Sequence, residues 1–410
     1  MLSIPDFCPT MTLVVLLTVT TASAATYYAS PSGGGTTCAH DAPCSLAGGI
    51  AALRSGDTLY LRGGTYTDSL SYTTGMIIPN GGGSWDTATT VASAPGETAR
   101  LRGGNPGVLL LPEGASWLIF DRLIFDGSAL SGLQEVIFLN VTDIHHIRIS
   151  NSEVGPGPHH AIAGAGAFLE FLNLSVHDVP SYGWYFGGNH SLFKNNTVAK
   201  TGGYAFHIYE SKATNVSNNT LDGNRITGCG YASLDWLGNY RPTHGLIISS
   251  GSNNVVQNNI LSGNWGGIQV GDTCLNCKVY NNTVVGNTVG SGLQIGSGYG
   301  ADNVEVINNI SYQNAGGDLE DYNPAGKVLR ANLIGTDPRF ADADFRLLAE
   351  SPARNTGETL PSVPTDCEDA PRGQGGAYDM GAREYGDGGG ITPSRRPRPV
   401  PRNLRVVTQP

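Results

Sequence analysis

A short pattern of apolar and polar positions repeats along the chain, in which apolar residues flank paired asparagines. The pattern apolar-x-Asn-Asn is found five times, at residues 193–198, 216–221, 256–261, 279–284 and 306–311. Weaker copies precede these at residues 119–124, 149–154 and 171–176. The copies alternate apolar and polar residues around a polar turn and carry no helical spacing. The repeat therefore predicts short strands joined by tight turns.

The spacing of the copies predicts how the strands are stacked. Taking the first Asn or Asp of each copy as its anchor gives Asp121, Asn151, Asn173, Asn195, Asn218, Asn258, Asn281 and Asn308. Successive anchors are 30, 22, 22, 23, 40, 23 and 27 residues apart, which indicates a base period near 22 to 23 with insertions. A strand repeat of this length predicts a solenoid, because one coil cannot bury its apolar face alone. Asparagine tolerates left-handed backbone, so we expect the anchors to stack in a ladder.

This repeat resembles the right-handed parallel β-helix of the pectate lyase-like superfamily, over residues 27–385. The resemblance implies an all-β fold, a single-stranded parallel β-helix with an N-terminal cap. Between Ser45 and Arg54, apolar residues at helical spacing predict a short helix that covers the open end of the solenoid. The closing run 377–382 resembles the C-terminal end of the same proteins, so we expect Asp379 and Glu384 to be structural.

Three segments divide the chain by composition. Residues 1–24 are expected to be a signal peptide, because the apolar run 11–24 ends in Ala-Ser-Ala and is too short to span a membrane well. Residues 25–385 form the β-helix domain, and residues 386–410 are a Gly-, Pro- and Arg-rich linker or disordered tail. We therefore expect a secreted protein, extracellular or periplasmic, that is a monomer without stable membrane insertion.

The net charge limits the kinds of partner, and the cysteine spacing predicts disulfides. The net charge of −10 argues against nucleic acid. Cys38 and Cys44 bracket a short loop and predict a disulfide, which suits export. Cys274 and Cys277 also predict a turn disulfide, because no second Cys-x-x-Cys and no His pair accompanies them as a zinc site would require.

After most Asn turns the chain carries a second strand whose alternation predicts one face. Residues expected to point inward are Ile162, Trp184, Phe206, Leu246, Ile268 and Leu293. Their outward neighbours are Ala163, Tyr185, His207, Ile247, Gln269 and Gln294. Just before these strands stand His160, Tyr182, Tyr204 and His244, which stacking would place in one row about 4.8 Å apart per coil.

This face concentrates groups that transfer protons and rings that suit sugars. His207, Tyr209 and Glu210 end one strand. The insertion 227–243 precedes His244 and adds Trp236 and Arg241. An alternative stays open for four members of the row: His160 and His244 as buried turn residues, and Tyr182 and Tyr204 as aromatic stacks that support the solenoid.

The predicted activity is a polysaccharide lyase that cleaves a uronic-acid polysaccharide by β-elimination. His207 or His244 is the expected base, Tyr204 the acid and Arg241 the group that neutralises the uronate carboxylate. The residues expected to bind substrate are His160, Tyr182, Tyr185, Tyr209, Glu210, Trp236 and Gln269. No metal ligand is assigned and no cofactor is established; calcium stays open, with Asp235 and Asp272 as the nearby acidic residues.

Three other functions remain open at this stage. Glycoside hydrolysis needs two carboxylates across the bond, and the coils before Thr243-His244-Gly245 offer Tyr and His where the β-helix polygalacturonases have Asp. C5-epimerisation begins with the same proton abstraction as elimination. A β-helix that only binds glycans, or acts as a surface adhesin, would use the same aromatic row.

Overall fold

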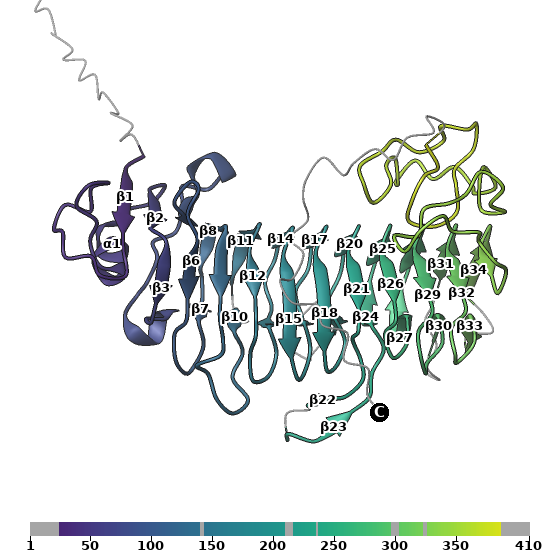
Figure 1. Ribbon diagram of the computed structural model, residues 1–410, viewed down its shortest axis with the longest axis horizontal. Helices are drawn as coiled ribbons and strands as arrows, with labels where there is room; N and C mark the ends of the chain where they lie inside the picture. Colours follow the sequence, from purple (N-terminus) through teal and green to yellow (C-terminus); the bar gives the residue numbers. More distant parts are fainter. Residues whose placement is uncertain are drawn as a thin grey trace, which may run out of the picture.

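The computed structural model describes residues 24–139, 143–209, 216–234, 237–296, 303–322 and 326–386. Across these residues the chain forms one long solenoid with three parallel sheets, whose strands follow one another along its axis (Figure 1). The predicted all-β parallel β-helix is confirmed. Each full coil supplies one strand to the twelve-stranded, then the eleven-stranded, then the ten-stranded sheet.

The twelve-stranded sheet is built from β1 (Thr26–Ala29), β2 (Thr58–Leu61), β5 (Thr89–Ser93), β8 (Ser116–Asp121), β11 (His145–Ser150), β14 (Glu170–Leu172), β17 (Leu192–Lys194), β20 (Thr220–Asp222), β25 (Val255–Gln257), β28 (Lys278–Tyr280), β31 (Val304–Ile307) and β34 (Lys327–Arg330). The eleven-stranded sheet is built from β3 (Gly64–Tyr66), β6 (Ala99–Leu101), β9 (Leu123–Phe125), β12 (Glu153–Val154), β15 (Ser175–Val179), β18 (Thr197–Thr201), β21 (Arg225–Thr227), β26 (Ile260–Ser262), β29 (Thr283–Val285), β32 (Ile310–Tyr312) and β35 (Leu333–Ile334).

The ten-stranded sheet is built from β4 (Leu70–Ser71), β7 (Leu109–Leu111), β10 (Ile137–Leu139), β13 (Ile162–Gly164), β16 (Trp184–Phe186), β19 (Phe206–Ile208), β24 (Leu246–Ser252), β27 (Ile268–Leu275), β30 (Leu293–Ile295) and β33 (Leu319–Asp321). A small antiparallel hairpin, β22 (Ser233–Leu234) and β23 (Tyr240–Arg241), projects from the solenoid beside this sheet (Figure 1). Two 3-10 helices, η1 (Tyr72–Thr74) and η2 (Trp85–Thr87), lie in the first coils.

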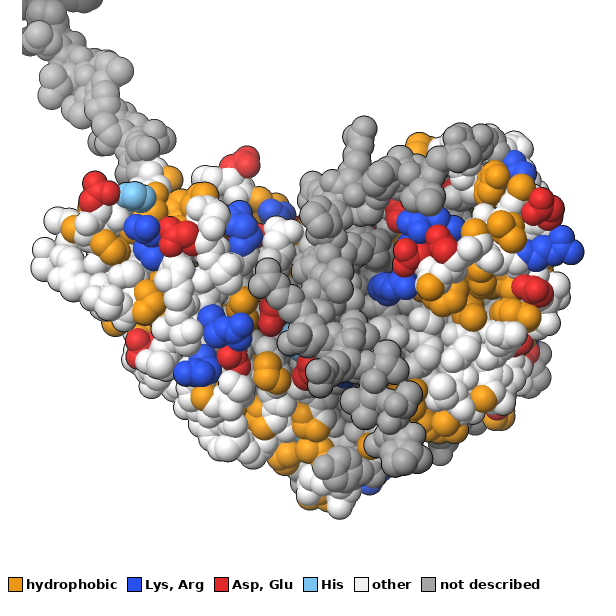
Figure 2. All heavy atoms as spheres, in the orientation of Figure 1, with side chains coloured by type: hydrophobic (Ala, Val, Ile, Leu, Met, Phe, Trp, Pro, Cys, Tyr) orange, Lys and Arg blue, Asp and Glu red, His pale blue; other side chains and the backbone are white. Residues whose placement is uncertain are grey.

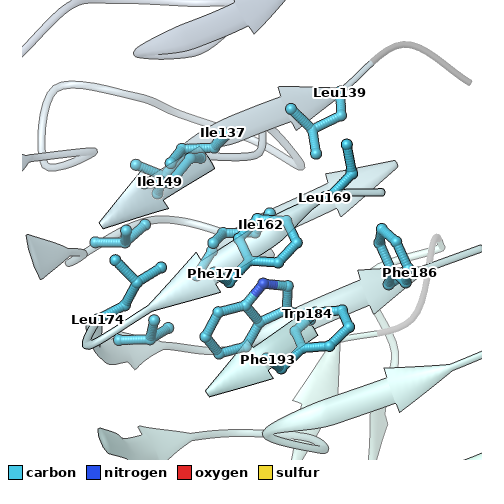
Figure 3. Packing of buried hydrophobic residues seen from close by; sticks show 14 of the residues in the cluster. Ile137, Leu139, Ile149, Ile162, Leu169, Phe171, Leu174, Trp184, Phe186 and Phe193 are labelled. Atoms are coloured by element: carbon cyan, nitrogen blue, oxygen red, sulfur yellow. The ribbon is translucent and has the colours of Figure 1, made fainter. Parts of the chain in front are cut away.

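Stacked side chains from successive coils fill the interior. Trp184 stacks on Phe206 with ring centroids 4.5 Å apart, and Phe171 stacks on Phe193 at 5.0 Å. Figure 3 shows Trp184 beside both Phe171 and Phe193, which come from the neighbouring sheet. Burial of each such ring stabilises the fold by about 1.5–3 kcal/mol.

A buried asparagine ladder runs along the corner between the twelve- and eleven-stranded sheets. It is formed by the residue that follows each positive-φ corner position, which is the second Asn of a pair at Asn196, Asn259, Asn282 and Asn309. From coil to coil the members are Asn196, Asn224, Asn259, Asn282, Asn309 and Asn332. Each backbone N–H and side-chain Nδ2 donates to the Oδ1 of the next member at 2.8–3.0 Å. The ladder therefore satisfies buried backbone groups and fixes the register of the coils.

Several of the predicted anchors also stack at this corner, since Asn173 donates to Asn151 at 3.1 Å, Asn151 donates to Asp121 at 2.7 Å and Asn308 donates to Asn281 at 3.4 Å. Asn151, Asn173, Asn195, Asn258 and Asn281 have φ between 50° and 57°, in the left-handed region that Asn tolerates. Two predicted anchors are wrong. Arg122 occupies the position assigned to Asp121, because Phe120 pairs with Ile149.

Asn218 is the second wrong anchor, because it belongs to another corner. Phe193 pairs with Leu221, so the partner of Asn195 is Gly223, which has the same positive φ of 67°. Asn218 instead lies at the corner between the ten- and twelve-stranded sheets, where Asn253 donates to it at 3.3 Å. In the buried ladder, Asn196, Asn224 and Asn259 are separated by 28 and 35 residues, whereas the predicted anchors Asn195, Asn218 and Asn258 are 23 and 40 residues apart.

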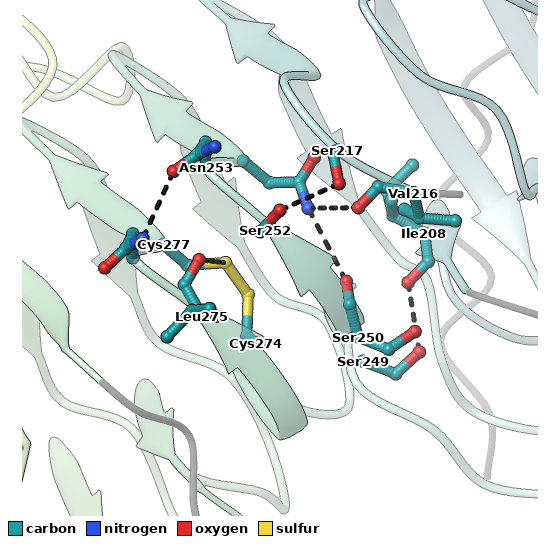
Figure 4. Close-up of a disulfide and its surroundings, with 12 residues drawn as sticks. Ile208, Val216, Ser217, Ser249, Ser250, Ser252, Asn253, Cys274, Leu275 and Cys277 are labelled. Carbon is teal, nitrogen blue, oxygen red and sulfur yellow. Dashed lines mark hydrogen bonds between the residues drawn. A yellow bond between two sulfur atoms is a disulfide. The ribbon is translucent and has the colours of Figure 1, made fainter.

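Both predicted disulfides are present, and the capping helix is confirmed. Helix α1 (Leu46–Ala52) begins at Ser45, whose side chain accepts a hydrogen bond from the Gly48 amide. Cys38 is bonded to Cys44 in the N-terminal cap. Cys274 is bonded to Cys277 at the end of β27, beside Ser252 and Asn253 (Figure 4). Within the described residues no helix combines the length and apolarity needed to cross a membrane.

The loops 336–386 fold back over the corner that carries the buried ladder (Figure 1). Arg372 donates to Asn258 Oδ1 at 2.7 Å, and Asn281 donates to the carbonyl of Asp379 at 3.1 Å. Arg372 also pairs with Glu384 at 3.2 Å. Asp379 accepts from the Asn355 amide at 2.7 Å. These contacts give Asp379 and Glu384 the structural role that was expected.

Candidate functional site

The outer face of the ten-stranded sheet carries the predicted row of side chains in register. Tyr185 pairs with His207, and His207 pairs with Ile247. Their neighbours Trp184 and Phe206 are fully buried, so the alternation places Tyr185 and His207 on the solvent side. The predicted register is confirmed along β13, β16, β19, β24, β27 and β30, and the six inward residues are buried. Of the residues predicted to point outward, Ala163, Ile247 and Gln294 are buried as well.

A second row stands where the chain enters these strands. His160 stacks on Tyr182 with centroids 4.9 Å apart, and Tyr182 lies 5.6 Å from Tyr204. Main-chain bonds hold this row, because the Ala161 amide donates to the Tyr182 carbonyl at 3.0 Å and the Gly183 amide to the Tyr204 carbonyl at 2.9 Å.

The two rows meet around His207. Its ring centroid is 5.1 Å from Tyr182, 5.1 Å from Tyr185, 5.0 Å from Tyr204 and 5.4 Å from Tyr209. We call these five residues the ring cluster. Tyr185 and Tyr209 are 36% and 40% exposed, so the cluster is open to solvent on its outer side.

The imidazole of His207 is neutral at neutral pH. Burial among the rings lowers its pKa to about 3. Its Nδ1 is buried without a partner, whereas its Nε2 lies 3.4 Å from the hydroxyl of Ser249. The Ser249 hydroxyl donates to the Ile208 carbonyl at 3.0 Å (Figure 4). A neutral ring nitrogen of this kind can accept a proton.

The phenols of the cluster are potential proton donors. Tyr204 donates to Gln269 Oε1 at 3.2 Å, which fixes the direction of its hydroxyl. Burial, and next the neighbouring Tyr209 and Tyr182, raises the pKa of Tyr185, so this phenol stays protonated at neutral pH.

His160 and His244 are buried, which corresponds to the turn-residue alternative. His160 is 7% exposed, and its Nδ1 accepts from the Tyr182 amide at 3.2 Å. His244 is 9% exposed and packs edge-on against Trp265 at 5.2 Å. Burial lowers the pKa of His244 to about 4. A side chain at Gly266 would collide with the His244 ring, so the next coil encloses this histidine.

The predicted loop residues are only partly within the described structure. Arg241 is exposed on β23, and its carbonyl accepts from the Ser233 hydroxyl at 2.8 Å. The hairpin is attached beside the ring cluster, because Ser181 donates to the Leu234 carbonyl at 2.6 Å and Leu234 donates to the Pro180 carbonyl at 3.1 Å. Glu210, Asp235 and Trp236 lie outside the described residues, and so does the side chain of Asp272.

Sequence reasoning missed four neighbours of the predicted site. Ser249 and Trp265 come from the following coils, and their approach depends on the exact register of the insertion before them. Glu135 and His159 lie beside His160, within 4.8 Å of it through their potential ligand atoms. The only sequence signal for this group was the His159-His160 pair itself.

Comparisons with known proteins agree with the fold. The family model described as "Right handed beta helix region" matches residues 161–332. No curated protein sequence matches the chain.

Two solved structures resemble the chain in architecture. The crystal structure of pectate lyase Pel9A superposes with a TM-score of 0.61 at 14% identity, covering 89% of this chain and 97% of that one. The complex structure of XylC with xylose gives a TM-score of 0.54 at 10% identity, covering 72% and 69%. Together with the three parallel sheets, these matches identify the chain as a right-handed parallel β-helix protein with the pectate lyase-like fold.

Proposed function

We propose that this protein is a secreted lyase that binds a uronic-acid polysaccharide on the outer face of the ten-stranded sheet and cleaves it by β-elimination. The observation that carries the proposal is the neutral His207 within a solvent-facing cluster of tyrosines. β-Elimination requires a base for the C5 proton, an acid for the leaving oxygen and a cation beside the carboxylate. The ring cluster and the adjacent hairpin offer one candidate for each.

His207 is the proposed base. With a pKa of about 3 the imidazole is unprotonated at neutral pH and has a free lone pair, while the same burial makes it a weaker base than an exposed histidine. Its Nε2 is the nitrogen next to the Ser249 hydroxyl, whereas its Nδ1 is buried. His244 is the weaker candidate, since Trp265 and the next coil enclose it.

Tyr204 is the proposed acid, and Arg241 is the proposed neutraliser of the uronate. The Tyr204 hydroxyl already donates to Gln269 and would donate to the leaving oxygen in the same way. Arg241 lies on the hairpin that is hydrogen-bonded to Pro180 and Ser181, directly before Tyr182. Tyr185 and Tyr209 would pack against the apolar faces of the sugar rings.

The ring cluster offers groups suited to elimination, while the nearby acidic residues Glu210 and Asp235 lie outside the described residues. Glycoside hydrolases use two carboxylates on either side of the bond, and the ring cluster, as the described residues define it, consists of phenols and an imidazole. Further support for a carbohydrate ligand comes from two of the structural neighbours, one a pectate lyase and the other solved with xylose.

The test is the appearance of unsaturated product, followed by ultraviolet absorbance, on a panel of polyuronates that includes polygalacturonate and alginate. We expect His207→Ala to reduce the rate by about 10²–10⁴-fold, the range for loss of a general base. His190→Ala, which removes an exposed imidazole at a different corner, is the matched control and should keep full activity.

Other outcomes separate the alternatives. Full activity in His207→Ala contradicts the assignment of the base. If the protein binds a polyuronate but leaves the polysaccharide chemically unchanged, this would favour a non-catalytic glycan-binding protein. Exchange of the C5 proton with solvent without chain cleavage would favour an epimerase.

A further inference from the structure

We propose that Glu135, His159 and His160 bind a divalent transition-metal ion of the zinc class, at the end of the aromatic row. Each residue offers one ligand atom, and the three atoms lie within 4.8 Å of one another. This inference is independent of the lyase proposal, because it concerns residues beside the ring cluster and is tested without substrate.

Two neighbouring coils bring the three side chains together. His159 and His160 precede β13, and Glu135 precedes β10 on the coil before. The coils are joined at this point by the Val136 amide, which donates to the His160 carbonyl at 3.2 Å, and by the pairing of Ile137 with Ile162. The ligand set is therefore placed by the sheet register and not by a mobile loop.

His159 is the residue whose ring nitrogens lack a partner. It is 4% exposed, and both of its ring nitrogens are buried without a hydrogen-bond partner. Its Nδ1 lies 3.6 Å from Glu135 Oε1, too far for a hydrogen bond. Buried polar atoms are normally partnered, and a metal ion between the imidazole and the carboxylate would give the Nδ1 of His159 a partner.

His160 can complete the set through Nδ1. Its ring lies 3.8 Å from that of His159, centroid to centroid. Nδ1 now accepts from the Tyr182 amide at the long distance of 3.2 Å, so Nε2 carries the proton in the neutral ring. Metal coordination by His160 Nδ1 would therefore replace this one weak hydrogen bond. Coordination by His159 would break no hydrogen bond.

The chemistry of the ligands selects the metal. Two imidazoles and one carboxylate suit Zn²⁺ or Co²⁺, whereas Ca²⁺ takes six to eight oxygens. Three protein ligands leave a fourth tetrahedral position for water. The 23% exposure of the Glu135 side chain gives that position access to solvent.

The test is a titration of the tag-free, chelator-treated protein with Co²⁺, followed by its visible absorption bands, with Zn²⁺ as competitor. We expect one equivalent of Co²⁺ to bind, Zn²⁺ to displace it and an excess of Ca²⁺ to leave it in place. Glu135→Gln and His159→Ala should each weaken Co²⁺ binding at least tenfold. His40→Ala, which removes an exposed imidazole of the N-terminal cap, is the matched control and should bind normally.

Two outcomes would contradict the proposal. Absence of Co²⁺ bands in the wild-type protein overturns it, and so does unchanged affinity in Glu135→Gln, which keeps the size of the side chain. If His159→Ala does not fold, as circular dichroism would reveal, Glu135→Gln and His40→Ala still give the answer.

Discussion

At the scale of single residues, burial controls the chemistry of the histidines. The same physical cause lowers the pKa of His207 to about 3 and that of His244 to about 4, and it lowers the pKa of His160 well below its ordinary value. Only His207 among these three combines a neutral ring with partial access to solvent. Exposure, and not residue type, therefore separates the candidate base from the other two.

The lowered pKa values predict acid lability. Between pH 6.5 and 4 the unfolded chain binds protons at these histidines that the folded chain does not bind, so stability falls as pH falls through that window. When the pH is lowered from 7 to 5, the free energy of unfolding should fall in both proteins. The fall should be about 1–2 kcal/mol smaller in His207→Gln than in the wild type, because the variant lacks this titrating group. Urea unfolding at the two pH values measures this.

The control for that measurement is Gln269→Ala, which changes a neighbouring side chain but removes no titrating group. It should show the wild-type loss of stability. An identical loss in His207→Gln and wild type would mean that His207 is protonated in the folded protein near its ordinary pKa.

At the scale of elements, the corners fix the register that assembles the site. Asn259 is fully buried, and its side chain takes part in four hydrogen bonds, with the Leu221 carbonyl, with Asn282, and with the backbone and side chain of Asn224. Asn276 sits in an exposed ladder at a different corner, 3.4 Å from Asn253. Both asparagines form side-chain hydrogen bonds between coils. Loss of the Asn259 side chain leaves buried amide groups without partners, whereas loss of the Asn276 side chain leaves groups that water can reach.

We therefore predict that Asn259→Ala lowers the free energy of unfolding by about 2–4 kcal/mol, because buried amides lose their partners. Asn276→Ala should cost only about 1 kcal/mol, because water replaces the lost contact and the remaining cost is that of alanine at a φ of 54°. Denaturant unfolding compares the two variants. Equal costs would contradict the stabilising role assigned to the buried ladder.

The strand alternation was predictable because period-two patterning follows directly from burial on one face. The inward Trp184 and outward His207 are examples. The place of Asn218 was not predictable, because Asn-Asn pairs occur at two corners and the sequence does not distinguish them. The enclosure of His244 was also hidden, since it depends on Trp265 and Gly266 from the next coil.

At the scale of the whole molecule, the C-terminal loops are joined to the solenoid by a buried ion pair. The Arg372 and Glu384 side chains are 0% and 3% exposed, and Arg372 reaches Asn258 on the ladder corner. Acidic and basic side chains also alternate over the surface of these loops, at the upper right of Figure 2. The loops therefore protect the outer side of the corner, away from the ring cluster.

Removing one partner of this pair should release the loops. Arg372→Met leaves Glu384 buried without its cation, which is expected to cost about 3–5 kcal/mol of stability. Faster limited proteolysis within residues 336–386, together with urea unfolding, measures the effect. Arg339→Met, at an exposed position in the same loops, should behave as wild type, and equal protease resistance in both variants would contradict this role.

The most direct test of the account is a crystal structure of Tyr204→Phe, which lacks the proposed acid, with a bound uronic-acid oligosaccharide. The account predicts the sugar along the outer face of the ten-stranded sheet, stacked on Tyr185 and Tyr209, with C5 of one uronate about 3–3.5 Å from His207 Nε2. An oligosaccharide bound on another sheet, or one whose C5 faces no nitrogen of His207, would contradict it.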